Sequence, residues 1–416
     1  MTTGNAPTPS AGFPPRKAEH EDWLRSLTAL PTVAGVETAV IGWVDRWLAE
    51  RRGLTSRRDE HGNIEIALAG GGSDDSTPVY FTAHLDHPGF VVERVIGPAT
   101  VELAFRGGVM DDYFPGSRVS ASARDGTAAL GGVVTERGDQ SDPFKSWIVE
   151  LDEASDTVQR GDLAVWELDA PEVLGTDSFG REVEGGCLHA RACDDLAAVA
   201  AALAALDALR ERRAAGEPTR DARVLLTRAE EIGFIGAIGA SRDGFMPAAS
   251  RVIALENSRS FLHDSPIGGG PIVRVGDRIN TFSPGLTAAV ARAAEKLAGR
   301  SAHATAVEKE DQTPSWRWQR KLMAGGACEA SVFCSFGYEA TCVCLPLGNY
   351  HNMADLDAVQ AGTSDGPPRI ERECIALADY HGMIDLLVAC GLELPEGGGF
   401  RERAEKLWES RKFVLG

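Results

Sequence analysis

Basic residues are scarce relative to acidic ones in this sequence. There are 42 lysines and arginines against 61 aspartates and glutamates, which gives a formal net charge of -19 at pH 7. Such a charge repels nucleic acid and anionic lipid unless a local basic patch intervenes. The densest basic run, RERRAAG from Arg210 to Gly216, is typical of a charged helix end. We therefore expect neither a nucleic acid nor a membrane as a partner.

Long apolar runs are also missing. A membrane-spanning helix needs about 18 or more consecutive apolar residues, and no stretch of the sequence provides them. The N-terminal stretch MTTGNAPTPSAGFPPRK is rich in Pro, Thr and Gly and lacks the apolar centre of a signal peptide. These absences predict a cytoplasmic protein.

The cysteines lack any pattern that would mark a disulfide framework. The eight cysteines include no CxxC pair, and Cys342 and Cys344 alternate along an apolar, strand-like run. We expect them to be buried free thiols.

The chain is long enough for two domains. It has 416 residues, more than a single core usually holds, and its 43% hydrophobic and 25% charged residues are typical of a globular protein. Between residues 101 and 183, short β-like runs such as RVSASA, GGVVTE, SWIVELD and DLAVWELD alternate with Gly and Asp turns, without a long helix. We predict an inserted small β domain at 101–183 and a discontinuous catalytic domain at 1–100 and 184–416.

The rest of the chain has an α/β texture. A shorter and a longer helix, separated by Pro31 and Gly35, are followed by a pair of strands, NIEIALAG and PVYFTAH. Further on, helical stretches such as CDDLAAVAAALAALDALRERR and GLTAAVARAAEKLAG alternate with the apolar strands RVLLTRA, RVIALE and ATCVCLPL. This alternation predicts an α/β fold with a mixed, largely parallel sheet flanked by helices.

Four of the apolar strands lead into side chains that can bind a metal. VYFTAH ends at His84, VLLTRAEE at Glu230 and Glu231, VIALE at Glu256, and CVCLPLGNYH runs on to His351. In an open α/β sheet the carboxyl ends of the strands form the ligand crevice. We therefore expect these side chains to meet at one place.

Two local patterns have ordinary explanations as well as functional ones. His84, Asp86 and His87 fall within AHLDHPGF, and such residues also occur in turns that hydrogen-bond backbone without an ion. In ARACDDLAAV, either Asp194 or Asp195 can cap the helix that follows. A cap does not need both, so one carboxylate is left for other work.

Glu230 and Glu231 are adjacent at a strand end. An apolar strand precedes them and apolar residues follow in AEEIGFIGA. Both carboxylates are therefore expected to be partly buried, which is costly without a cation.

In order and in local sequence, these segments resemble the dinuclear zinc exopeptidases, and most closely the cobalt-activated glutamyl and deblocking aminopeptidases that form tetrahedral TET particles. The resemblance covers nearly the whole chain and rests on AHLDHPGF, ARACDDLAA, AEEIGFIGA, ALENS, GGGPIVRVGD, AGGACEASVF and LPLGNYHN. The 110 residues from His84 to Asp194 leave room for the β insert. The 95 residues from Glu256 to His351 are too few for the lid of relatives such as acetylornithine deacetylase.

The resemblance implies two divalent metal ions, zinc or cobalt, bridged by Asp194. One ion would also take His84 and Glu256, and the other Glu231 and His351. The three carboxylates would offset three of the four positive charges of such a pair.

The resemblance also implies the roles of neighbouring residues. Glu230 would be the general base that takes a proton from the attacking water and gives it to the leaving amine. Asp86 would hydrogen-bond the free ring nitrogen of His84. His87 is not expected to be a ligand and would line the entrance or fill a loop. The resemblance further implies a homo-oligomer built through the β insert, which could also gate substrate.

Three features depart from the family pattern. Glu256 and Glu329 stand where these aminopeptidases usually have aspartate, and the 308–321 loop with Trp316 and Trp318 differs from their shorter loop. In the wider superfamily, glutamate at the Glu256 position goes with carboxypeptidases and deacylases, and Arg259 could then bind a terminal carboxylate.

The sequence therefore predicts an aminopeptidase that uses a two-metal-activated water on a peptide or small amide substrate. A carboxypeptidase and an N-acyl amidohydrolase or deacylase are the enzymatic alternatives. A binding module with a decayed site is a third reading, disfavoured because no expected ligand is missing.

Overall fold

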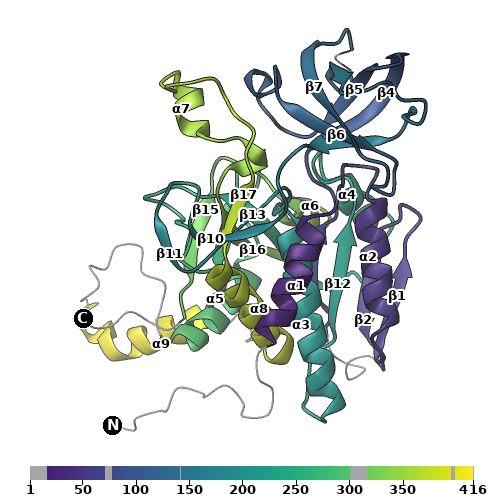
Figure 1. Ribbon diagram of the computed structural model, residues 1–416. Coiled ribbons are helices and arrows are strands. Elements are labelled where there is room, and N and C mark those ends of the chain that lie inside the picture. Colours follow the sequence, from purple (N-terminus) through teal and green to yellow (C-terminus); the bar gives the residue numbers. More distant parts are fainter. Residues whose placement is uncertain (1–15, 71–76, 141, 300–315, 395–398, 416) are drawn as a thin grey trace.

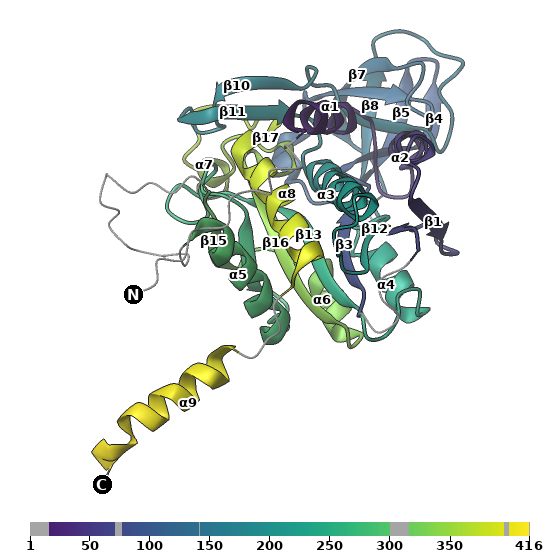
Figure 2. The same ribbon diagram turned by 90° about the horizontal axis from the view of Figure 1, so that it is seen from below.

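The computed structural model describes residues 16–70, 77–140, 142–299, 316–394 and 399–415. An eight-stranded mixed sheet with helices packed on it forms the main body, and a closed β-barrel stands beside one end of this sheet (Figure 1). A three-stranded sheet lies at the same end of the molecule as the barrel (Figure 2).

The main sheet has a parallel centre. In spatial order its strands are β1 (Leu54–Arg58), β2 (Ile64–Leu68), β12 (Ala222–Thr227), β3 (Val79–His84), β13 (Arg251–Arg259), β16 (Glu339–Leu347), β14 (Ile272–Asp277) and β15 (Gln319–Met323). The neighbours from β12 to β16 run parallel, whereas β1 with β2, β2 with β12, and β14 with β16 are antiparallel. The predicted mixed, largely parallel sheet is confirmed. The two strands predicted at NIEIALAG and PVYFTAH exist as β2 and β3. They are not paired with each other, because β12 lies between them.

Helices cover both faces of this sheet (Figure 2). One face carries α1 (Lys17–Thr28), α2 (Thr38–Ala49), α3 (Leu196–Ala214), α5 (Pro284–Ala298) and α8 (Leu377–Leu392), and the other carries α4 (Ile235–Arg242) and α6 (Glu329–Ser335). Successive strand residues point to opposite faces, so Phe81 lies in the first core and its neighbour Tyr80 in the second. Helices α1 and α2 each have 12 residues, so the predicted difference in their lengths is wrong.

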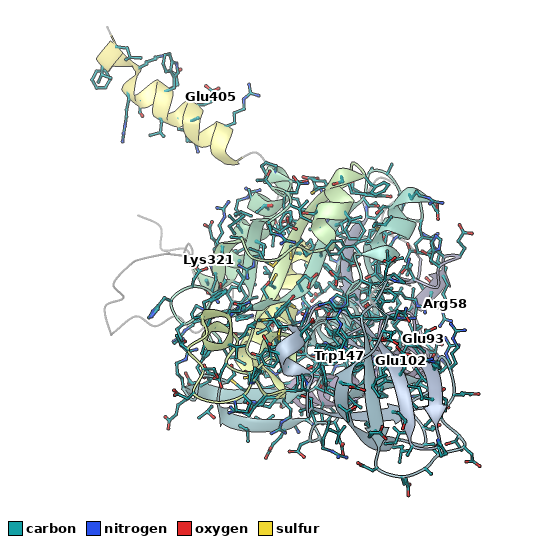
Figure 3. The ribbon with its side chains drawn as sticks, turned by 90° about the horizontal axis from the view of Figure 1, so that it is seen from above. Arg58, Glu93, Glu102, Trp147, Lys321 and Glu405 are labelled. Atoms are coloured by element: carbon teal, nitrogen blue, oxygen red, sulfur yellow. The ribbon has the colours of Figure 1, made fainter. Side chains whose placement is uncertain are left out.

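The barrel is built on an aromatic core. Its strands are β4 (Gly89–Gly97), β5 (Thr100–Arg106), β6 (Arg118–Ser122), β7 (Leu130–Arg137), β8 (Ser146–Leu151) and β9 (Leu163–Trp166), with the 3-10 turn η1 (Asp111–Tyr113) between β5 and β6. Phe114 stacks on Trp147 with ring centroids 4.1 Å apart and contacts Phe90, Phe105 and Trp166 edge-on. Figure 3 shows Trp147 together with Glu93 and Glu102 on this part of the molecule, away from Lys321 of β15.

The barrel strands run from residue 89 to residue 166, whereas the predicted insert ran from 101 to 183. At its start, β4 follows the loop after β3 directly, and the apolar run GFVVERVIG does not reveal which sheet it joins. At its end, β10 (Glu172–Thr176) and β11 (Glu182–Ala190) pair with each other, and β11 also pairs with β17 (Glu373–Ala376). These strands therefore belong to the three-stranded sheet.

The remaining segments lie around the main sheet. They are η3 (Tyr350–Asn352) and α7 (Leu356–Ala361). The C-terminal α9 (Gly399–Arg411) with η4 (Lys412–Leu415) extends away from the body (Figure 2). Of the predicted 308–321 loop, residues 308–315 lie outside the described residues, Trp316 and Trp318 pack in or against the main hydrophobic core, and residues 319–321 belong to β15 instead of a loop. All eight cysteines are free and seven are buried, which confirms that prediction. Among the described residues, every helix falls short of the length and hydropathy of a membrane span.

Candidate metal centre

The four strands that lead into metal-capable side chains are neighbours. β12, β3, β13 and β16 run parallel, so their carboxyl ends meet at one edge of the sheet. Thr227 at the end of β12 pairs with His84 at the end of β3. Glu256 lies inside β13, which continues to Arg259, so the prediction that this strand ends at Glu256 is wrong. His351 follows β16 in η3.

Asp194 lies between two groups of potential ligands. His84 Nε2 is 3.4 Å from Asp194 Oδ1 and 3.8 Å from Glu256 Oε2. His351 Nε2 is 3.6 Å from Asp194 Oδ2 and 3.4 Å from Glu231 Oε2. The two oxygens of one carboxylate therefore face two different histidines, and the structure brings all five predicted ligand residues together.

The carboxylates of these groups are buried without enough positive charge. Glu256 is 7% exposed and Asp194 is 3% exposed. Burial raises the pKa of Glu231 well above its usual value and that of Glu256 to about 8. Within the described residues, Asp194 Oδ1, Glu231 Oε1 and Glu256 Oε1 have no hydrogen-bond partner. Buried polar atoms normally have partners, so these oxygens need a cation.

The donor set fits a pair of divalent cations. Each group offers imidazole nitrogen and carboxylate oxygen, which are ligands of zinc and of similar first-row ions. Four-coordinate ions with bonds of about 2.1 Å place their ligand atoms roughly 3.4 Å apart. The separations of 3.4 to 3.8 Å from His84 to the oxygens of Asp194 and Glu256 are of this size. Two ions sharing Asp194 would satisfy the orphaned oxygens.

Asp86 holds the two glutamates rather than the histidine ring. Its Oδ1 accepts a hydrogen bond from the Glu230 amide at 2.9 Å and its Oδ2 one from the Glu231 amide at 3.0 Å. The Asp86 carboxylate is 3.6 Å from His84 Nδ1, whereas the Asp86 backbone carbonyl is 3.1 Å from that nitrogen. The predicted bond from the ring to the carboxylate is therefore wrong in its acceptor: the backbone oxygen takes that place, because the carboxylate is already used by the two amides.

Glu230 lies near the two ligand groups that share Asp194 but belongs to neither of them. Its Oε2 is 4.0 Å from His84 Nε2, and its side chain is part of a third potential metal-binding group with His84 and Glu231. Burial raises the pKa of Glu230 well above its usual value, and the neighbouring Glu256 and Asp86 carboxylates add to this shift. A buried carboxyl group of high proton affinity therefore lies beside His84 and Glu231.

Asp195 takes the cap position of α3 but does not cap it. Its side chain makes no cap hydrogen bond; instead it accepts one from the His84 amide at 3.1 Å and one from Asn257 Nδ2 at 2.8 Å. The capping interpretation is thus wrong for its side chain. Asp195 links β3, β13 and the start of α3, and Asp194 is left facing the histidines.

His87 is a buried positioning residue and not part of an entrance. It is 2% exposed, and its ring contacts the Asp194 carbonyl on one side and Asn352 Oδ1, at 3.0 Å, on the other. Asn352 in turn donates to the carbonyls of Arg191 and Glu371. His87 therefore connects the Asp194 loop to the loop that carries His351.

The barrel side of the molecule orients His351. Its Nδ1 lies 2.7 Å from the carbonyl oxygen of Gly108, in the segment between β5 and η1, so it donates a hydrogen bond to the barrel connection. The neighbouring Tyr350 ring stacks on the imidazole at a centroid distance of 3.7 Å and an angle of 22°. These contacts leave Nε2 free to face Asp194 and Glu231.

The sequence from residue 62 to residue 301 matches the family model of the M42 glutamyl aminopeptidases. The chain belongs to this family. The match spans more than half of the chain and confirms the predictions of a peptide hydrolase and of a metal-dependent aminopeptidase. His351 lies beyond the matched residues, and its place in the site comes from the fold.

Several solved peptidase structures share this fold. An aminopeptidase from the archaeon Desulfurococcus kamchatkensis is 20% identical, with a TM-score of 0.68 over 91% of this chain and 95% of its own. The TET1 peptidase of Pyrococcus horikoshii, which can assemble into a tetrahedron or a large octahedral shell, is 19% identical, with a TM-score of 0.65 over 90% of this chain and 100% of its own. An M18-family aminopeptidase from Thermotoga maritima is 14% identical, with a TM-score of 0.58 over 91% of this chain and 96% of its own.

None of the curated proteins compared with this M42 chain matches it.

Glu329 adds a further carboxylate to the M42 site. It lies at the start of α6, is 2% exposed, and its Oε1 has no partner among the described residues. Burial raises the pKa of Glu329 to about 7, and the charges of His84 and Asp86 also act on it. A carboxyl group is therefore present at this position of the site, although it belongs to glutamate where the family usually has aspartate.

Glu373 is a site residue that the sequence analysis missed. It is fully buried at the start of β17, and its two oxygens accept hydrogen bonds from the Asp194 and His351 amides, each at 2.9 Å. One carboxylate thus fixes the backbone of two potential ligands from distant segments. The only local signal is an acidic residue before the apolar run CIA, and this does not by itself indicate a site.

We expect Glu373→Gln to weaken divalent-metal binding by about 10- to 100-fold, the usual effect of removing a partner that orients ligands. An amide has one acceptor oxygen, so one of the two backbone N–H groups would face an NH2 group. Titration of the metal-free protein with zinc or cobalt measures the change. Glu371→Gln is the matched control, because the Glu371 carboxylate pairs with exposed Arg369. Unchanged metal affinity in Glu373→Gln would contradict the positioning role.

Proposed function

We propose that this M42 chain binds two divalent cations, zinc or cobalt, and uses them to release the N-terminal residue of peptides. One ion would be held by His84, Asp194 and Glu256, and the other by Asp194, Glu231 and His351. The observation that carries the proposal is the Asp194 carboxylate, whose Oδ1 and Oδ2 face different histidines at 3.4 and 3.6 Å.

The cations would supply Lewis acidity: when bound, they polarise the peptide carbonyl and lower the pKa of the attacking water. The chain itself supplies the proton transfers. Glu230 takes the proton from the water and passes it to the leaving amine, a role that suits a buried carboxylate of raised pKa. Asp86 holds the Glu230 and Glu231 amides, so that base and ligand keep a fixed separation.

The charges around the site favour a substrate with a free α-ammonium. Glu230 and Glu329 are carboxylates at the site that the proposed ligand sets leave unused. Arg259, which would be the natural partner of a terminal carboxylate, donates instead to Asp357 Oδ1 at 2.7 Å. This arrangement supports an aminopeptidase over a carboxypeptidase, although Glu256 has the residue type of the latter.

We also propose that the barrel is an inserted domain of a zinc-exopeptidase fold, and that it joins copies of the chain into a homo-oligomer or gates substrate. Its segment at Gly108 touches the ring of His351, so it is placed to affect the site. The assembly of Pyrococcus horikoshii TET1 into a tetrahedron or a large octahedral shell supports an oligomer by analogy of fold. The cytoplasmic location and the absence of a nucleic-acid partner stay predictions.

Substrate polarity gives the direct test of the proposed activity. We expect the protein loaded with cobalt or zinc to cleave aminoacyl p-nitroanilides and aminoacyl amides, because these offer a free α-ammonium and no terminal carboxylate. Amino-blocked peptides and N-acyl amino acids should not be cleaved. The reverse pattern of cleavage would show a carboxypeptidase or deacylase instead.

Glu230→Gln is expected to keep about two metal ions per chain and to lower kcat by about 10²- to 10⁴-fold, since the proton acceptor is lost while the ligands remain. Elemental analysis and turnover of a leucyl p-nitroanilide measure the two effects. Glu231→Gln is the paired variant and should lose metal. Substantial turnover by Glu230→Gln at saturating metal would refute its role as base.

Light scattering should give a mass of at least two 44.3 kDa chains, and this mass should not change with dilution over a wide range. The expectation follows from the proposed role of the barrel in assembly. A particle of one chain mass at every concentration would refute the homo-oligomer.

A further inference from the structure

A pocket of about 270 Å³ lies next to the metal centre. It is formed where the ends of β13 and β16, the turn between β10 and β11, and the start of α7 come together, with Ser178, Leu262, Tyr350 and Asp357 among its lining residues. We call it the Tyr350 pocket. Its volume is below the about 300–1,000 Å³ of sites for drug-sized ligands, so it suits a single side chain.

Tyr350 is the wall that the pocket shares with the metal centre. Tyr350 is among the lining residues of the pocket, and its ring stacks on the His351 imidazole at a centroid distance of 3.7 Å. The charges of Glu231 and Asp194 act on its hydroxyl, whose pKa burial raises well above the usual value. Because Tyr350 both lines the pocket and contacts His351, the pocket is within reach of a side chain whose backbone is bound at the metal centre.

Much of the remaining lining is apolar and partly uncovered. Phe179 and Leu262 are 40% and 45% exposed at the rim. Met353 and Leu356 lie deeper, where they pack with Tyr113 from the barrel side. An apolar side chain entering the pocket would cover exposed carbon surface, which favours binding.

The charged residues of the lining leave an excess of negative charge. The one cation among the described residues that line the pocket is Arg259, and two anions, Asp355 and Asp357, lie with it. Asp355 is paired with Arg369, which is not part of the lining, at 3.3 Å. Arg369 also pairs with Glu371, at 3.1 Å, so it does not fully offset Asp355. The excess negative charge disfavours an acidic side chain in the pocket.

Arg259 is already held by its neighbours. Its Nη2 donates to Asp357 Oδ1 at 2.7 Å and its Nη1 to Gln360 Oε1 at 3.2 Å, while its guanidinium lies 5.0 Å from the centre of the Phe261 ring. A substrate carboxylate would have to displace Asp357 to gain this cation. An acidic side chain therefore finds no free partner here.

We infer that the Tyr350 pocket receives the side chain of the N-terminal residue of the substrate and selects uncharged, mainly apolar side chains over acidic ones. The inference rests on the proposed aminopeptidase function and names its substrate class. It sets this chain apart from the glutamyl preference in the description of its family. Asp357, by holding Arg259, is the residue that decides against acidic side chains.

The test measures cleavage of leucyl and glutamyl p-nitroanilides by the metal-loaded protein. We expect kcat/KM for the leucyl substrate to exceed that for the glutamyl substrate by about tenfold, the effect of an unpaired charged group. In Asp357→Asn, the glutamyl-to-leucyl ratio should rise about fivefold, since an exposed ion pair has a strength of this order. Adding Arg259→Gln to that variant should remove the gain. Asp365→Asn, an exposed carboxylate outside the lining, should leave the ratio unchanged.

Calorimetric binding of free leucine and free glutamate to the same proteins separates the inference from the function. If no anilide is cleaved but leucine binds more tightly than glutamate, and Asp357→Asn narrows the gap, the aminopeptidase proposal falls and the pocket assignment stands. If anilides are cleaved but the glutamyl substrate is preferred, or Asp357→Asn leaves the ratio unchanged, the pocket assignment is overturned. If no anilide is cleaved and neither amino acid binds, the aminopeptidase proposal and the pocket assignment are both overturned.

Discussion

The burial of several carboxylates around two histidines is the constraint on which this site depends. Within the described residues, the ion-pair partners of Asp194, Glu231 and Glu256 are His84 and His351, and three carboxylate oxygens have no hydrogen-bond partner. Such a cluster is unfavourable alone and becomes favourable with cations. The fold thus buries an excess of negative charge that divalent metals can neutralise, as the metal-dependent chemistry of the M42 family requires.

The parallel strands of the main sheet bring these carboxylates and histidines together. Four neighbouring strands end at the same edge, so residues from distant parts of the chain reach one place without long loops. Carboxylates that carry no proposed metal then fix the backbone around the ligands. Asp86 holds the Glu230 and Glu231 amides, and Glu373 holds those of Asp194 and His351.

The barrel and the Tyr350 pocket connect the site to its surroundings. Gly108 on the barrel side orients His351, and Tyr113 packs with Met353 and Leu356 beside the pocket. Substrate choice and any effect of assembly would therefore act through the same short segment, residues 348–358. This segment contains several left-handed non-glycine residues, such as Asn349 and His351, whose backbone the surrounding contacts must hold.

The sequence by itself determined the fold class and the residue types of the site. The apolar runs before His84, Glu231 and Glu256 predict strands from local sequence alone. The metal-binding capacity of these three side chains follows from their residue types. Tertiary structure alone decided that β12 separates β2 from β3, that Asp86 binds amides and not a ring, and that Arg259 is held by Asp357. The physical reason is that strand order and the partner of a polar side chain depend on segments often about 100 or more residues away, and residue type does not encode which of several partners comes within hydrogen-bond distance.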